Sequence, residues 1–255
     1  MSPLAPRSPR RGAEEALGYP GVHVHRPILL TDAGVLAVGG AGAHGDSLAS
    51  AWEHAIRVAG GAPLNERTSV LAIGSNAAAA TLRRKMSRRR ASRVVPLLPA
   101  VVVGIGAAHS AHVSLGGYIA AAPYAARSAA THAALGLFDS DQLCALDDSE
   151  PNYQRISISP SRYPVCVVGY PLPPPVSYQL YRSVWGVLAH RGHVVTLRGQ
   201  AAMHGLVRAD PVLRQVVPLR EPSAAVRSLS QPRVQALVRD HWRRTGAAVP
   251  DGLTG

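Results

Sequence analysis

The sequence predicts an α+β protein, because strand patterns fill its middle and helix patterns fill its last third. The run Val70–Ile73 is apolar, includes two β-branched residues and is followed by glycine, which is typical of a buried strand. Between Tyr153 and Leu197, short strand-like runs alternate with turns and end in a hairpin. Beyond that hairpin, helices are predicted over 224–229 and 232–243. In the second helix four apolar residues share one face: Val234, Leu237, Val238 and Trp242.

The segments at the two ends of the chain differ from this middle. Residues 1–21 are rich in Pro, Arg, Ser and Gly, so we expect a disordered N-terminal segment. Residues 22–66 are expected to form a hairpin over 28–38 and a helix over 48–59. Residues 246–255 are expected to be a frayed tail.

A glycine-rich stretch, Gly40–Gly45, fits the GxGxxG spacing of dinucleotide-binding loops. That motif needs a βαβ unit and an acidic residue about 20 positions further on. Here Gly60–Pro63 interrupts the pattern, and Glu66 stands in a charged loop. A flexible loop therefore explains this stretch better than a dinucleotide site.

The turn Gly74-Ser75-Asn76 stands between the strand Val70–Ile73 and an Ala-rich helix pattern. Glycine tolerates unusual backbone angles, and Ser and Asn can bond nearby backbone groups. The free N–H groups at such a turn and the positive end of the following helix point toward one place. The sequence therefore predicts an anion-binding turn here.

Two segments in the expected order resemble the gamma-glutamylcyclotransferase-like family. Ile73-Gly74-Ser75-Asn76 is similar to the family's substrate-binding loop, usually Tyr-Gly-Ser-Asn-Leu after a first strand. Leu146-Asp147-Asp148-Ser149-Glu150, followed by Tyr153-Gln154-Arg155, is similar to its Leu-Asp-x-x-Glu-Gly and Tyr-x-Arg segments. The resemblance extends from Ser69 to about Leu197.

This resemblance implies a mixed, partly closed β-barrel with flanking helices, in a domain spanning 67–245 that includes the C-terminal helices. It also implies an acyltransferase that cyclises a gamma-glutamyl amine or peptide to 5-oxoproline and releases the amine, without a cofactor. Glu150 would be the catalytic acid/base. The expected substrate-binding residues are Ile73, Gly74, Ser75, Asn76, Ala77 and Tyr118, the last because nearby glycines let the backbone approach a ligand.

The chemistry needs little machinery. The substrate's α-amino group attacks its own γ-carbonyl, and one carboxyl group can take the proton and return it to the leaving amine. The turn N–H groups would hold the α-carboxylate or polarise the γ-carbonyl. Spacing alone favours an exposed acidic turn residue at Glu150, and it is the paired resemblance that favours the catalytic role. Ile73, Ala77 and Pro151 replace the Tyr, Leu and Gly common in the family, so a changed pocket or a loss of activity remains open.

Charge and composition leave two alternatives to the enzyme. The chain has 255 residues, 47% of them hydrophobic, and a net charge of +12. The first alternative is a non-catalytic relative that binds a small anion. The second is a basic nucleic-acid-associated protein using the Arg83–Arg93 cluster, although no aromatics interleave with it to stack bases. A high Arg to Lys ratio also follows from GC-rich coding, so we expect no nucleic-acid partner.

The remaining features predict a cytoplasmic protein without a metal. No apolar run is long enough to span a membrane, and no signal peptide is evident. Cys144 and Cys166 form neither a disulfide framework nor a metal quartet. The pairs His23/His25 and His109/His112 supply only two ligands each, so we expect no metal site.

Overall fold

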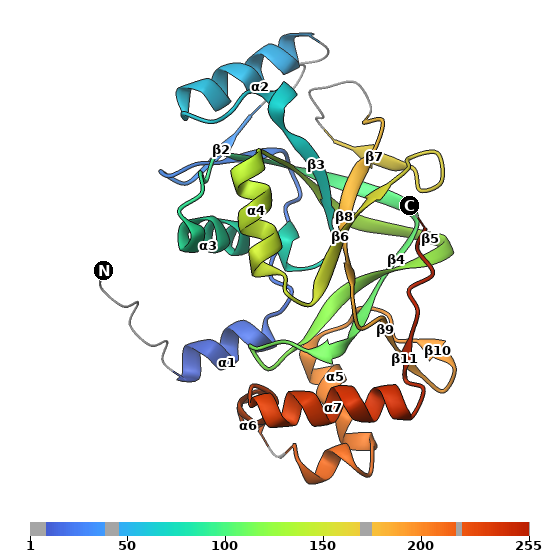
Figure 1. Ribbon diagram of the computed structural model, residues 1–255. Helices are drawn as coiled ribbons and strands as arrows, with labels where there is room; N and C mark the ends of the chain where they lie inside the picture. The colour runs from blue at the N-terminus through green and yellow to red at the C-terminus, as the bar shows by residue number, and fades with distance from the viewer. Residues whose placement is uncertain (1–8, 39–45, 169–174, 218–220, 255) are drawn as a thin grey trace. The chain divides into compact units, whose positions relative to one another are not determined.

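The computed structural model describes residues 9–38, 46–168, 175–217 and 221–254, and its elements are drawn in Figure 1. The chain divides into two compact units, each built from separate segments. The sheet unit comprises Val22–Ala107, Ala122–Val184 and Asp251–Gly255. The helical unit comprises Met1–Gly21, Ala108–Ala121 and Trp185–Pro250. The units are not consecutive along the chain because strands β4 (Val95–Val113) and β5 (Ile119–Phe138) contribute to both.

The sheet unit is organised around β3 (Thr68–Ala72), which contains most of the predicted first strand. On one side β3 pairs antiparallel with β5, and on the other it pairs parallel with β8 (Tyr178–Ser183). Strand β6 (Tyr153–Ile158) then pairs antiparallel with β8. The sheet is therefore mixed, as expected.

Strand β4 provides the other end of this sheet and has 19 residues. One of its edges pairs first with β1 (Ile28–Leu30) and then with β7 (Val165–Val167). Strand β1 also pairs with β2 (Val35–Ala37), which confirms the predicted hairpin.

The expected partly closed barrel is wrong, because the described strands form an open sheet. Within the sheet unit the order is β4-β5-β3-β8-β6, and β6 does not pair back onto β4 in the described part of the chain. The free edge of β4 is occupied by β1 and β7 instead. The protein is thus an α+β protein with a large mixed sheet that is not closed.

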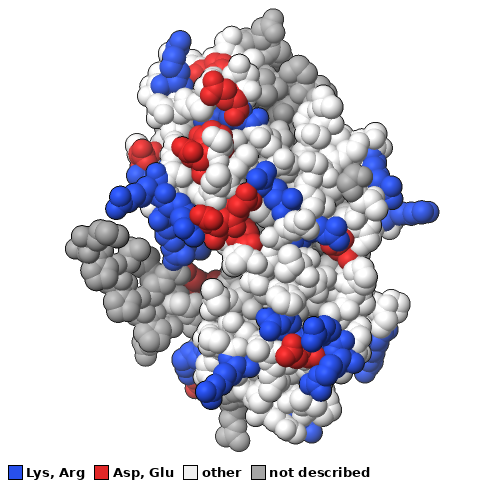
Figure 2. Space-filling model, viewed as in Figure 1, with Lys and Arg blue, Asp and Glu red and all other residues white. Residues whose placement is uncertain are grey.

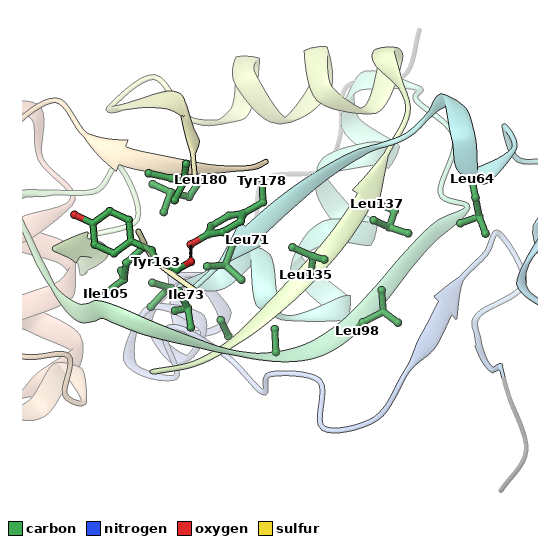
Figure 3. Packing of buried hydrophobic residues seen from close by; sticks show 14 of the residues in the cluster. Leu64, Leu71, Ile73, Leu98, Ile105, Leu135, Leu137, Tyr163, Tyr178 and Leu180 are labelled. Atoms are coloured by element: carbon green, nitrogen blue, oxygen red, sulfur yellow. Dashed lines mark hydrogen bonds between the residues drawn. The ribbon is translucent and has the colours of Figure 1, made fainter. Parts of the chain in front are cut away.

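Helices cover the sheet of this unit on both faces. Because successive side chains of a strand point to opposite faces, Val70 and Leu71 of β3 enter different cores. Val70 packs in a cluster with residues of α3 (Ala79–Arg89) and α4 (Ser140–Ser149). Leu71 packs in the larger cluster drawn in Figure 3, which also contains Trp52 of α2 (Asp46–Val58).

The helical unit has its own apolar core. Its helices are α1 (Pro9–Leu17), α5 (Gln200–Ala209), α6 (Pro222–Leu229) and α7 (Pro232–Arg244). Its short strands are β9 (Val187–His190), β10 (His193–Val194) and β11 (Ala248–Val249). The predicted C-terminal helices are therefore confirmed, and Val238 and Trp242 of α7 are buried in this core.

Single 3-10 turns occur at η1 (Leu64–Glu66), η2 (Ser75–Ala77) and η3 (Leu213–Gln215).

Both end segments are more ordered than the sequence predicted. Helix α1 lies within the segment expected to be disordered, where Ala13 and Ala16 pack with Val226 of α6. In the expected frayed tail, β11 pairs with β9, and Leu253 is buried in the core of the sheet unit. Local composition missed both because the stabilising contacts come from distant parts of the chain. The motif Gly40–Gly45 lies outside the described residues.

Candidate active site

The predicted anion-binding turn has the expected local structure. Strand β3 ends just before Gly74, and the 3-10 turn η2 leads directly into α3. The first bonds of the turn run from the Ala77 N–H to the Gly74 carbonyl (3.0 Å) and from the Ala78 N–H to the Ser75 carbonyl (3.1 Å). The N–H groups of Ser75 and Asn76 therefore have no partner inside the turn, as at any helix start.

Glu150 is positioned by the end of α4. This helix begins with a capping box, in which the Asp139 carboxylate accepts from the Gln142 N–H at 2.9 Å and the Gln142 side chain accepts from the Asp139 N–H at 3.1 Å. Its C-cap is Glu150, whose N–H donates to the Asp147 carbonyl at 3.1 Å. Because α3 and α4 lie side by side, the end of α4 comes close to the turn where α3 begins (Figure 1).

The two motif segments meet through their side chains. Asn76 Nδ2 donates to Glu150 Oε1 at 2.9 Å, across 74 positions of sequence. Lys85 of α3 closes the group: its Nζ donates to Asn76 Oδ1 at 2.8 Å and forms an ion pair with Glu150 Oε1. The side chains of Lys85 and Glu150 are only 13% and 15% exposed. We call Asn76, Lys85 and Glu150 the polar triad.

The triad holds Glu150 through one oxygen. Oε1 accepts from both Asn76 and Lys85, whereas the described residues provide no recorded donor to Oε2. Oε2 is therefore the oxygen that could take a proton from a ligand.

A second polar cluster fixes the corner between α4 and β6. Arg155 donates from Nε and Nη2 to the two oxygens of Asp147, at 2.8 and 2.7 Å, and the Tyr181 hydroxyl donates to Asp147 Oδ1 at 2.7 Å. The hydrogen bond from Arg155 lowers the pKa of Asp147, and the same bond raises the pKa of Arg155. Burial, followed by the bond to Asp147, raises the pKa of Tyr181. This cluster links α4, β6 and β8 just before Glu150, so its contribution is to position that residue.

The other residues expected to bind substrate have different surroundings. The side chains of Ile73 and Ala77 are buried in the two cores of the sheet unit, so only their backbone groups are available to a ligand. Gly74 and Ser75 are partly exposed. Tyr118 belongs to the helical unit, where its ring stacks on Tyr19 at a centroid distance of 4.2 Å.

Sequence reasoning missed two side chains near the turn. The ring of His23 hydrogen-bonds to the backbone of Gly74, and its buried Nε2 has no partner among the described residues. Burial lowers the pKa of His23, so the ring is neutral at neutral pH. Lys85 was grouped with the basic cluster, although it stands three residues after the buried Leu82 on α3.

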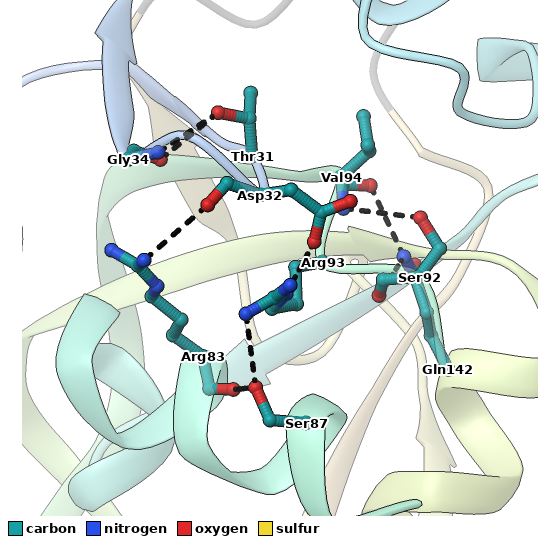
Figure 4. A network of polar contacts seen from close by, with 9 residues as sticks. All are labelled: Thr31, Asp32, Gly34, Arg83, Ser87, Ser92, Arg93, Val94 and Gln142. Atoms are coloured by element: carbon teal, nitrogen blue, oxygen red, sulfur yellow. Dashed lines mark hydrogen bonds and ion pairs between the residues drawn. The ribbon is translucent and has the colours of Figure 1, made fainter. Parts of the chain in front are cut away.

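Much of the basic cluster is engaged within the molecule. Arg83 donates to the Asp32 carbonyl at 3.3 Å, and Arg93 forms an ion pair with the Asp32 carboxylate (Figure 4). Arg89 pairs with Asp148 at 3.3 Å. Acidic side chains also lie among the basic ones on the face drawn in Figure 2. These contacts give no separate support to a nucleic-acid interface.

No group of three or more His, Cys, Asp or Glu side chains in the described ranges is arranged to hold a metal ion. Within the same ranges, every helix is too short or too polar to cross a membrane.

Comparison with solved structures gives a partial likeness. A protein of Arabidopsis thaliana with a known solution structure aligns with 46% of this chain at 18% identity and a TM-score of 0.33. The alignment covers 62% of that protein, less than two thirds of its length. No family model and no curated protein matches the chain. A likeness of this size assigns neither a fold nor a function.

Proposed function

We propose that this chain is a gamma-glutamylcyclotransferase-like enzyme that cyclises a gamma-glutamyl amine or peptide to 5-oxoproline and releases the amine. One observation carries the proposal: the contact of Asn76 with Glu150 joins the two motif segments that resemble this family. A solvated turn residue would not need this contact. We place the reaction in the cytoplasm, with a small molecule as substrate and without a cofactor.

In the proposed reaction, Glu150 moves one proton twice. Oε2 takes a proton from the α-ammonium of the substrate, and the freed amine attacks the γ-carbonyl carbon to form the five-membered lactam. The bond from that carbon to the leaving nitrogen breaks as Glu150 returns the proton to that nitrogen. The second proton lost by the ring nitrogen passes to the released amine, which departs as an ammonium ion. The N–H groups of Ser75 and Asn76 suit the carbonyl oxygen, where negative charge develops.

The test is release of 5-oxoproline from a panel of gamma-glutamyl amino acids, gamma-glutamyl amines and glutathione. Because a positioned acid/base contributes about 10²–10⁴-fold, Glu150→Gln should lower kcat by about that factor. Asp148→Asn is the matched control, since Asp148 is a neighbouring carboxylate on α4 whose side chain is 57% exposed. Equal loss in both variants, or no turnover of any panel member by the wild type, would refute the proposal.

The alternative is a relative that binds a small anion without turnover. The contacts of Lys85 with Glu150 and Asn76 favour it, because they place a cation beside the turn, where a small anion could bind. Binding of 5-oxoproline without turnover of any panel member would select this alternative.

A further inference from the structure

Lys85 is the single lysine of the chain, and the other 26 of its 27 Lys and Arg residues are arginine. Arginine therefore serves wherever the protein needs a cation, except at one position in the candidate site. The two side chains differ physically: an ammonium is a compact point charge with three donors, whereas a guanidinium is a broad planar fork. At position 85 the compact cation contacts both Asn76 and Glu150.

The contacts of Lys85 with the described residues leave one of its donors unused. Its Nζ donates to Asn76 Oδ1 and Glu150 Oε1, and an ammonium has three N–H groups. Because Nζ contacts the carboxylate of Glu150, a ligand group bound at Glu150 would lie beside Nζ. An ammonium so placed is a receptor for a negatively charged ligand group.

We propose that Lys85 determines specificity by binding the α-carboxylate of the ligand through this third N–H. The inference rests on the proposed function and assigns roles that the sequence left open. The carboxylate of the ligand goes to Lys85, and the N–H groups of the Gly74–Asn76 turn are left for the γ-carbonyl. Ligands without a carboxylate beside the reacting amine would lose this contact.

A single lysine makes the test direct. Protein labelled with ¹³C,¹⁵N-lysine gives one side-chain signal, which needs no assignment. The probes are 5-oxoproline and 2-pyrrolidinone, which is the same lactam without the carboxylate. In the wild type, 5-oxoproline should shift the lysine signal saturably and 2-pyrrolidinone should not. An unmoved signal at saturating 5-oxoproline, or equal shifts with both lactams, would overturn the inference.

Variants provide a second measurement. Lys85→Met should weaken 5-oxoproline binding at least tenfold and change 2-pyrrolidinone binding less than twofold. Arg88→Met, which removes one charge from the exposed end of the same helix, should leave the ratio of the two affinities unchanged. If both variants lower the ratio of the 5-oxoproline affinity to the 2-pyrrolidinone affinity equally, the effect of Lys85 is one of general charge, and the inference is overturned. If Lys85→Met does not fold, the wild-type lysine signal still decides.

The outcomes separate this inference from the proposed function. A lysine signal that responds to 5-oxoproline without turnover of any substrate refutes the enzyme and keeps the carboxylate receptor. Turnover with an unresponsive lysine signal keeps the enzyme and refutes the receptor.

Discussion

Removing either partner of the Lys85–Glu150 ion pair should destabilise the sheet unit strongly. Breaking a buried pair by removing one partner costs about 3–5 kcal/mol, because the remaining charge is left without compensation. Since these side chains keep 13% and 15% of their exposure, we expect the lower end, about 3 kcal/mol, for Lys85→Met or Glu150→Gln. The double variant removes both charges, so its cost should fall below the sum of the single costs by about 2 kcal/mol.

Amide hydrogen exchange of peptides covering 68–90 measures this loss of stability in the sheet unit alone. A local measurement is needed because the chain has two units, which can unfold separately. The matched control is the exposed pair Arg89–Asp148, with side chains 52% and 57% exposed. Its coupling energy should be about 0.2–1 kcal/mol. If the costs of Lys85→Met and Glu150→Gln simply add, or if both pairs couple equally, the pair is not sheltered as described and the reasoning fails.

Three further predictions concern stability. Burial, with a smaller effect of Arg239, lowers the pKa of His112 to about 4, so the unfolded state alone takes up a proton below about pH 6.5. The helical unit should thus lose about 3 kcal/mol as the pH falls from 7 to 4, and urea unfolding of His112→Gln should lack this dependence. The pKa of Asp147 is lowered, so its ionised carboxylate stabilises the folded protein above the usual aspartate pKa. This stabilisation is lost as the pH falls through the lowered pKa. Acid unfolding of Asp147→Asn, compared with that of the wild type, should lack this loss of stability. In Gly186→Ala, the new Cβ would lie 2.3 Å from the Val249 carbonyl oxygen, in a residue whose φ is +73°. Thermal unfolding should show a loss of stability of about 1–3 kcal/mol. The control Gly205→Ala has open space around the new Cβ and should lose no stability.

The elements that sequence predicted well depend on neighbouring residues. The turn at Gly74 needs only the strand before it and the helix after it. The hairpin over 28–38 is equally local. Each of these patterns can be read within a few residues.

The elements that sequence missed depend on distant residues. Strand β4 has 19 residues and β5 has 20, although Ala, Gly and Pro, of which they contain several, are depleted in strands. The pairing partners β1, β7 and β5 hold this backbone extended, and no local pattern identifies them. The barrel was wrong for the same reason, since closure depends on which strand occupies the free edge of β4.

The candidate site combines both situations. The motifs identified Asn76 and Glu150, but the residue that joins them was hidden in a basic run. Lys85 follows Leu82 by three positions and precedes Met86, both buried, so its place on α3 borders the apolar face rather than the solvated one. A charge at that border requires a partner, because an unpaired charge there is costly to bury. That requirement, together with the absence of any other lysine from the sequence, points to position 85 from the sequence itself. The response of the single lysine signal to a ligand carboxylate is therefore the most informative observation on this protein.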